Sequence, residues 1–176
     1  MQGEAPLLPR LNRYRPIAST ASVRFKTVKP VLGTMASHLN FVAADTKSWE
    51  QAAALQLEVL AQEGLVICYA RNDHLELNVP YDFYGQPRAY EPDFVVRLRY
   101  GLQLLLEVKG QPMPETEAKH QAAKRWVSAV NHWGRLGRWC FAVCWDPQRL
   151  GEKLRPLAAA NSANSASAAS ALAAQN

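Results

Sequence analysis

Two carboxylates and a lysine in the middle of the chain have a spacing that suits metal-dependent hydrolysis. Asp93 follows a proline at the start of an apolar segment, and Glu107 and Lys109 end the next apolar segment. Alternate residues of a strand project from the same face, so Glu107 and Lys109 are expected to point the same way. If the short connection around Gly101 makes the two segments antiparallel neighbours, Asp93 lies near Glu107. Two carboxylates and an ammonium group would then meet at one point.

These groups match the needs of phosphodiester hydrolysis. Mg²⁺, or Mn²⁺ in its place, prefers carboxylate oxygens, completed by water and by substrate phosphate oxygens. A metal held there polarises the phosphate and lowers the pKa of a bound water. Lys109 could orient or help to deprotonate that water and offset charge in the transition state, and Val108 could present its carbonyl to the metal. Each motif alone is weak, because a Glu-x-Lys pair at a strand end is most often a surface ion pair.

The elements around this set predict an α/β (α+β) fold. Apolar residues at helical spacing between good caps favour helices over 49–64 and 115–134. Apolar runs and period-two alternation favour strands over 65–70, 74–83, 90–100, 102–109 and 138–145. The leucines before Glu107 indicate a strand that is buried on both faces. We therefore expect a β-sheet that is covered by helices.

Composition divides the chain into three zones. Residues 1–44 are rich in Pro, Arg, Ser and Thr and predict an extended arm or linker. Residues 158–176 are an Ala/Ser/Asn low-complexity segment that predicts a disordered or marginally helical tail, and 45–157 form the domain. The formal charge of +5 comes from the first 47 residues, because 48–176 hold thirteen basic and thirteen acidic side chains. A basic arm would add affinity for phosphates without reading sequence, although a solvated basic linker explains it equally well.

Several function classes find no support in the sequence. It contains no phosphate-binding loop of the G-x-x-x-x-G-K-[ST] type, no G-x-G-x-x-G fingerprint, no G-x-S-x-G and no Cys/His set with zinc spacing. No apolar run is long enough to cross a bilayer, and the N-terminus lacks the layout of a secretory signal. The three cysteines lie in apolar runs without pairing motifs. We expect a cytoplasmic protein without a membrane partner.

The segments YEPDFVVRL and LLLEVKGQ resemble the signature of PD-(D/E)XK nucleases. The order of SWEQ, EAKHQAAKRWVSAVN and GRWCFAV around them is similar to the C-terminal endonuclease region of type III restriction enzyme Res subunits. This resemblance covers about residues 8–147. It implies a restriction-endonuclease-like core, a mixed β-sheet flanked by helices in the order α-β-β-β-α-β. It also implies that Asp93 and Glu107 are metal ligands, that Lys109 is the catalytic lysine, and that Glu50 supports the metal site.

The resemblance implies a Mg²⁺-dependent endonuclease that acts on double-stranded DNA in a restriction-modification system. Res subunits carry a helicase motor upstream that this chain does not have. ATP-driven action and control by a methyltransferase are therefore expected only with separate helicase and methyltransferase subunits. A homodimer on DNA would allow both strands to be cut. The alternatives are a structure-specific or repair nuclease with the same site, and a catalytically silent remnant that binds DNA or a partner.

Further polar residues are candidates for contacts with nucleic acid. They are Gln111, Lys119, Lys124, Arg125, Arg135 and Arg138. Gln111 follows the Glu-Val-Lys-Gly motif directly and could instead shape a turn. The basic residues of the second predicted helix could instead form a solvated face, with Lys119 paired to Glu115. Glu50, in the first turn of the first helix, could simply interact with the helix dipole.

Overall fold

The computed structural model describes residues 8–9, 14, 19–45, 48–109 and 113–173. Its strands are β1 (Val31–Gly33), β2 (Phe41–Ala43), β3 (Val66–Arg71), β4 (Val79–Phe83), β5 (Gln86–Tyr90), β6 (Phe94–Leu98), β7 (Leu102–Val108) and β8 (Arg138–Cys144). Its α-helices are α1 (Trp49–Gln62), α2 (Pro114–Trp133) and α3 (Leu150–Ala173). Short 3₁₀ turns η1, η2 and η3 cover Thr20–Ser22, Arg99–Gly101 and Pro147–Arg149.

The central sheet has the strand order β3-β6-β7-β8. The pairs β3/β6 and β6/β7 are antiparallel, and β7/β8 is parallel. A parallel pair needs a long crossover, which α2 provides between β7 and β8. Along the chain, the helices and central-sheet strands follow the order α1-β3-β6-β7-α2-β8-α3, of which the part from α1 to β8 has the predicted order α-β-β-β-α-β. The predicted mixed sheet flanked by helices is therefore confirmed.

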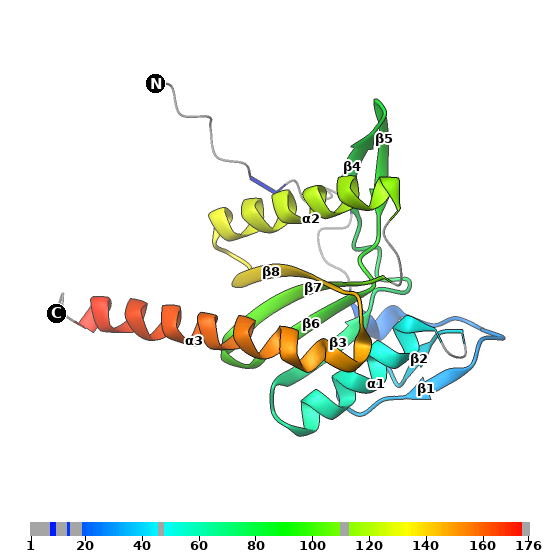
Figure 1. The fold of residues 1–176 in the computed structure, drawn as a ribbon, viewed down its shortest axis with the longest axis horizontal. Coiled ribbons are helices and arrows are strands. Elements are labelled where there is room, and N and C mark those ends of the chain that lie inside the picture. The colour runs from blue at the N-terminus through cyan, green and yellow to red at the C-terminus, as the bar shows by residue number, and fades with distance from the viewer. Residues whose placement is uncertain (1–7, 10–13, 15–18, 46–47, 110–112, 174–176) are drawn as a thin grey trace.

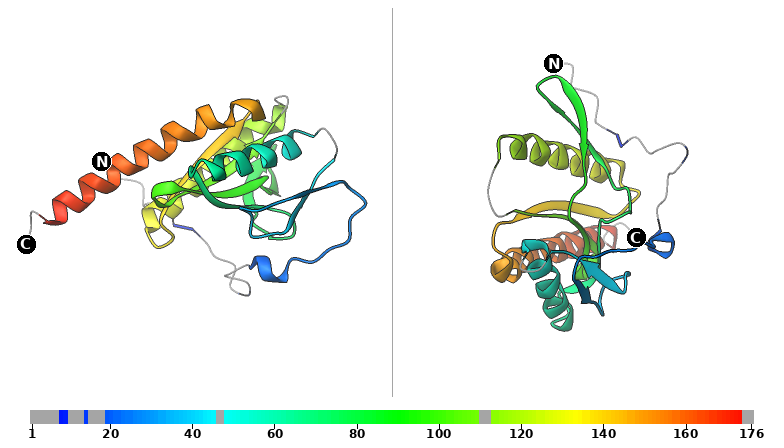
Figure 2. Two further views of the ribbon diagram at one scale, coloured as in Figure 1. Left: turned by 90° about the horizontal axis from the view of Figure 1, so that it is seen from below. Right: turned by 90° about the vertical axis from the view of Figure 1, so that its right-hand side faces the viewer.

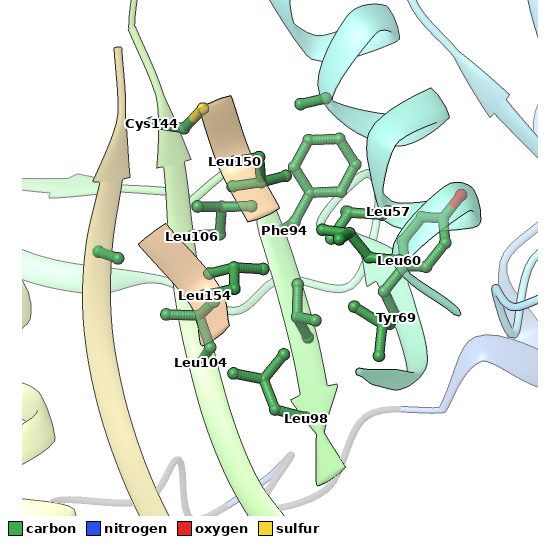
Figure 3. Packing of buried hydrophobic residues seen from close by; sticks show 14 of the residues in the cluster. Leu57, Leu60, Tyr69, Phe94, Leu98, Leu104, Leu106, Cys144, Leu150 and Leu154 are labelled. Carbon is green, nitrogen blue, oxygen red and sulfur yellow. The ribbon is translucent and has the colours of Figure 1, made fainter. Parts of the chain in front are cut away.

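The helices form a layer on each side of this sheet (Figures 1 and 2). On one side, α1 and α3 bury Leu57, Leu60, Leu150 and Leu154 against Phe94 of β6, as Figure 3 shows. On the other side, α2 buries Ala122 and Ala123 against Leu105 of β7, together with Tyr90. Because side chains alternate along a strand, Leu104, Leu106 and Val108 face α1 and α3, whereas Leu105 and Glu107 face α2.

Helices α1 and α2 begin and end within two residues of the predicted bounds. Ser48 caps α1, with its hydroxyl accepting a hydrogen bond from the backbone N–H of Gln51 at 3.1 Å. Pro114 is the first residue of α2, and Glu115 and Glu117 lie in its first turn, where the helix dipole favours negative charge. Gly134 ends α2 in the left-handed conformation, with φ of 71°.

The strand expected over 74–83 is shorter in the structure. It begins only at Val79, because His74 and Glu76 have φ of 58° and 57°, which breaks an extended run. The buried side chain of Asn72 binds both the carbonyl and the N–H of Leu77, at 2.9 and 3.3 Å. From Val79 the chain forms the hairpin β4–β5, which pairs only with itself and projects beside α2 (Figure 1).

Ordered structure extends beyond the expected domain limits of 45 and 157. Strands β1 and β2 lie inside the expected arm of 1–44, and Val42 and Ala44 belong to the hydrophobic core. Helix α3 continues through the Ala/Ser/Asn segment that was expected to form a tail, and it buries Ala158. The side-chain amide of Asn161 donates to the carbonyl of Tyr100 at 2.8 Å. Among the described residues, no helix has the length and apolar character needed to cross a membrane.

Candidate active site

Asp93, which directly precedes β6, lies beside Glu107 of the neighbouring strand β7, as the sequence predicts. In the β6/β7 pair, Phe94 is opposite Leu106, so the preceding Asp93 is next to Glu107 on the adjoining strand. Phe94 and Leu106 are buried against α1 and α3. The two carboxylates therefore project from the α2 side of the sheet, at the end where β6 begins and β7 finishes.

Backbone hydrogen bonds fix Asp93 between two strands. Its Oδ2 accepts from the N–H of Val108 at 2.7 Å, which ties the carboxylate to the end of β7. Its carbonyl accepts from the N–H of Asn72 at 2.9 Å, just after β3. Asp93 thus has a set position although it lies in the connection before β6.

Glu107 and Lys109 form an ion pair at the same end of the sheet. The distance from Lys109 Nζ to Glu107 Oε1 is 2.9 Å. The Glu107 side chain is 3% exposed and that of Lys109 is 32% exposed, so the lysine leads from the buried carboxylate to solvent. The backbone N–H of Lys109 donates to the carbonyl of Cys144 at 2.9 Å, which holds this residue beside β8. The second oxygen of Glu107, Oε2, is buried and has no hydrogen-bond partner.

The electrostatics show an excess of negative charge around Asp93. Burial, followed by the charge of Glu107, raises the pKa of Asp93 from 3.8 to about 7, against the opposing effects of the Val108 N–H and Lys109. Glu50, at the start of α1, raises it further. Burial lowers the pKa of Lys109, but its hydrogen bond to Glu107 and the three carboxylates outweigh this and raise it overall. A cation beside Asp93 and Glu107 would relieve the repulsion between the carboxylates.

The donor set fits a hard divalent cation that keeps several waters. Mg²⁺ is commonly held by one or two carboxylates, completed by water and phosphate oxygens. Asp93 and the unpartnered Oε2 of Glu107 can supply such oxygens. In the part of the chain that the structure describes, no three His, Cys, Asp or Glu residues are grouped closely enough to hold a metal. Glu50 therefore does not join Asp93 and Glu107 in a three-carboxylate cluster, and it acts on them through its charge.

The predicted residues for contact with nucleic acid lie at different distances from this site. Lys119, on the first half of α2, is paired with Glu115 at 3.6 Å, as expected. Lys124 and Arg125 are further along α2, and both are exposed. Gln111 is outside the described residues. Val108, the candidate for a metal contact through its carbonyl, lies between Glu107 and Lys109, and its N–H donates to Asp93.

Arg135 and Arg138 are not brought to the carboxylates. Arg138 is opposite Leu102 at the start of β7, whereas Glu107 is five residues further along that strand. At about 3.3 Å for each residue, this places Arg138 roughly 16 Å from the site along the sheet. Arg135 precedes β8 at the same end, where its guanidinium lies 5.5 Å from the centre of the Trp133 ring. These two arginines are therefore remote from Asp93 and Glu107.

Two residues at the site were missed by the sequence analysis. Tyr90, the last residue of β5, and His120, on α2, are buried, and the charge of Glu107 acts on both. Tyr90 stands three residues before Asp93, and His120 shares the apolar face of α2 with Ala123. A histidine on the inner face of an amphipathic helix was the available signal, but the sequence does not show which strand that face covers.

Comparisons with models of protein families, with curated proteins and with solved structures found no match to this chain. Its activity is therefore inferred from its own residues and their geometry. The strongest basis is the group formed by Asp93, Glu107 and Lys109.

Proposed function

We propose that this chain is a Mg²⁺-dependent DNA endonuclease module with a restriction-endonuclease-like core of the PD-(D/E)XK type. The observation that carries this proposal is the Glu107 carboxylate, which is buried beside Asp93, paired to Lys109 through one oxygen and without a partner on the other. A buried carboxylate that only stabilised the fold would normally have both oxygens satisfied. The order α1-β3-β6-β7-α2-β8 supports the same core.

Asp93 and Glu107 would hold the metal, with Val108 as a further candidate through its carbonyl. Bound Mg²⁺ supplies Lewis acidity at the phosphate and lowers the pKa of a bound water. The ammonium of Lys109, anchored by Glu107, can donate a hydrogen bond to the attacking water or to a phosphate oxygen. Its charge offsets the negative charge that develops as the water oxygen bonds to phosphorus and the bond to the leaving oxygen breaks.

The surroundings favour a nucleic acid over a small phosphate ester. The carboxylates lie where β6 begins and β7 ends, and Lys119, Lys124 and Arg125 add basic side chains on α2. Exposed Arg24 and Lys26 in the N-terminal segment add positive charge. The proposed substrate is double-stranded DNA, in a restriction-modification system whose helicase and methyltransferase would be separate subunits.

A plasmid-nicking assay tests this proposal. Purified wild type at roughly 10 mM Mg²⁺, enough to saturate a weak hard-ion site, is expected to relax supercoiled plasmid and to stop when EDTA is added. Lys109→Ala and Asp93→Asn should lose this activity, whereas Lys153→Ala, which removes an exposed lysine of α3, should keep it.

Two outcomes would contradict the proposal. Equal nicking by wild type, Lys109→Ala and Asp93→Asn would show that another protein or another site cuts the plasmid. Binding of DNA without metal-dependent nicking by any of the proteins would favour the alternative, a silent module that depends on a separate subunit.

A further inference from the structure

Three buried polar atoms of the described residues have no hydrogen-bond partner, and they belong to one neighbourhood. They are the hydroxyl of Tyr90, Oε2 of Glu107 and Nε2 of His120. The exposed fractions of these residues are 6%, 2% and 7%. A buried polar atom without a partner typically destabilises a fold by about 1–3 kcal/mol, so three together indicate a shared ligand.

Glu107 links the other two residues. Its charge acts on Tyr90, whose pKa is raised by burial, then by Glu107 and Asp93. It also acts on His120, although burial dominates there and lowers the pKa of the imidazole. Tyr90 packs in the same cluster as Leu105 of β7 and Ala123 of α2, and Glu107 projects from the same face of β7 as Leu105. The hydroxyl and the imidazole therefore border the space under α2 that Glu107 enters.

Packing holds both rings in place. The Tyr90 ring contacts Tyr81 edge-on, with 6.1 Å between the ring centres. The His120 ring lies 5.4 Å from the centre of Phe141 and 6.2 Å from that of Trp145.

The chemistry of the three atoms fits a water molecule. A carboxylate oxygen accepts, a phenol both donates and accepts, and Nε2 of a neutral imidazole does one or the other. One water can donate to Glu107 while it binds Tyr90 and His120, and buried waters typically make about three such bonds. Direct metal binding by His120 is not supported, because the described residues hold no group of three His, Cys, Asp or Glu that could bind a metal.

We infer that Tyr90 and His120 are positioning residues that hold a buried water against Oε2 of Glu107 and so orient this carboxylate for the divalent cation. This inference rests on the metal site of the proposed function. Lys109 fixes one oxygen of Glu107 at 2.9 Å, and the water fixes the other. Each carboxylate oxygen has a second lone pair, which leaves Glu107 able to bind the cation.

Binding of Mn²⁺ in the absence of DNA, measured by isothermal titration calorimetry, tests this inference. Tyr90→Phe removes only the hydroxyl, and His120→Leu removes the ring nitrogens. Both should weaken Mn²⁺ binding by about 10–100-fold, as is typical when a group that orients a metal ligand is lost. His120→Gln restores a polar atom near the position of Nε2 and should recover most of the affinity. Tyr84→Phe, at the exposed hairpin tip, is the control for the loss of a hydroxyl.

Thermal unfolding in EDTA separates orientation from stability. Tyr90→Phe should unfold at or above the temperature of the wild type, since it removes a buried hydroxyl without a protein partner. A lower unfolding temperature with unchanged Mn²⁺ affinity would overturn the inference and assign Tyr90 a structural role. Unchanged affinity in both Tyr90→Phe and His120→Leu, or no Mn²⁺ binding by the wild type, would also overturn it.

The nicking assay distinguishes failure of this inference from failure of the proposed function. If wild type nicks DNA and Tyr90→Phe binds Mn²⁺ normally, the proposed nuclease function is supported and the positioning role of Tyr90 is refuted. If Tyr90→Phe binds Mn²⁺ weakly but no protein nicks DNA, the positioning role is supported and the proposed nuclease function is refuted.

Discussion

Asp93 and Glu107 are held together against their mutual repulsion. Two carboxylates in a partly buried setting compete for one neighbouring lysine, and Lys109 hydrogen-bonds only to Glu107. Asp93 takes part of its stabilisation from the Val108 N–H at 2.7 Å, which is not enough to keep its pKa in the usual range. Such arrangements are frequent where a fold prepares a site for a cation, because the cation later removes the penalty.

The raised pKa of Asp93 predicts that the metal-free protein loses stability as pH rises. The unfolded carboxyl ionises near 3.8 and the folded one near 7, so folding favours the protonated form. This contribution is complete below about pH 3.8 and is lost as pH passes through about 7. The gap corresponds to about 4 kcal/mol at most. In EDTA, wild type should therefore become less stable relative to Asp93→Asn between about pH 4 and pH 8.

Urea denaturation at several pH values measures this difference. In Asp93→Asn the amide oxygen of the new side chain can still accept the Val108 N–H, so the substitution removes mainly the ionisation. Asp45→Asn, at an exposed ion pair with Lys29, is the matched control and should show no such trend. A constant stability difference between wild type and Asp93→Asn across this pH range would show that Asp93 ionises normally in the fold.

The meeting of Asp93, Glu107 and Lys109 could be predicted because it depends on local rules. Alternation along one strand places Glu107 and Lys109 together, and a short connection between neighbouring strands brings Asp93 beside them. Tyr90 and His120 reach Glu107 from β5 and α2, so their proximity depends on how three elements pack. No spacing along the chain encodes that arrangement.

At the scale of elements, the largest departure from the sequence analysis is α3. Its second half consists mostly of Ala, Ser and Asn, which offer little apolar surface and predict a tail. The helix is nevertheless anchored at its start, where Leu150 and Leu154 are fully buried against the sheet (Figure 3). Small side chains at Ala158 and Asn161 then allow close packing further along. Sequence reasoning missed this because alanine favours a helix without showing which face is covered.

The anchoring of α3 gives a direct stability prediction. Leu154→Ala should lower the free energy of unfolding by about 2–5 kcal/mol, because it leaves a cavity in the core formed with α1 and the sheet. Leu55→Ala on α1 is the matched control, since Leu55 is 52% exposed and its loss should change stability far less. Chemical denaturation of both variants measures the difference. Similar losses for the two would mean that α3 does not contribute to the core.

The hairpin β4–β5 is a second element that the sequence only partly revealed. The sequence does not predict its separation from the central sheet. Glu115 of α2 accepts from Tyr81 and from Arg88, each at 2.6 Å, and so fastens the hairpin to the helix. These contacts join residues that are 27 and 34 positions apart in the sequence, so a local sequence pattern cannot predict them. The hairpin leads through Tyr90 directly to Asp93, so its attachment helps to place the site.

At the scale of the whole molecule, helices cover both faces of the sheet, and the site lies at one end of its two central strands. Strand residues make up most of the core, which α1, α2 and α3 cover on both faces, and the carboxylates lie where β6 begins and β7 ends. A site at the ends of the strands can be reached by an extended polymer. Under the proposed function, one such site would cut one strand, so cleavage of both strands would require two copies on DNA.

We propose that the buried carboxylate of Glu107 takes part in metal-dependent cleavage of DNA. Its most direct test is the single-turnover rate at which an end-labelled duplex is cut in Mg²⁺ by Glu107→Gln and by Glu152→Gln, an exposed change on α3. We expect Glu107→Gln to lose at least about a hundredfold in rate, in line with the loss of one preorganised polar group at a reacting centre, and Glu152→Gln to match the wild type. Equal cleavage rates for the two folded variants would show that the Glu107 carboxylate is not needed for cleavage.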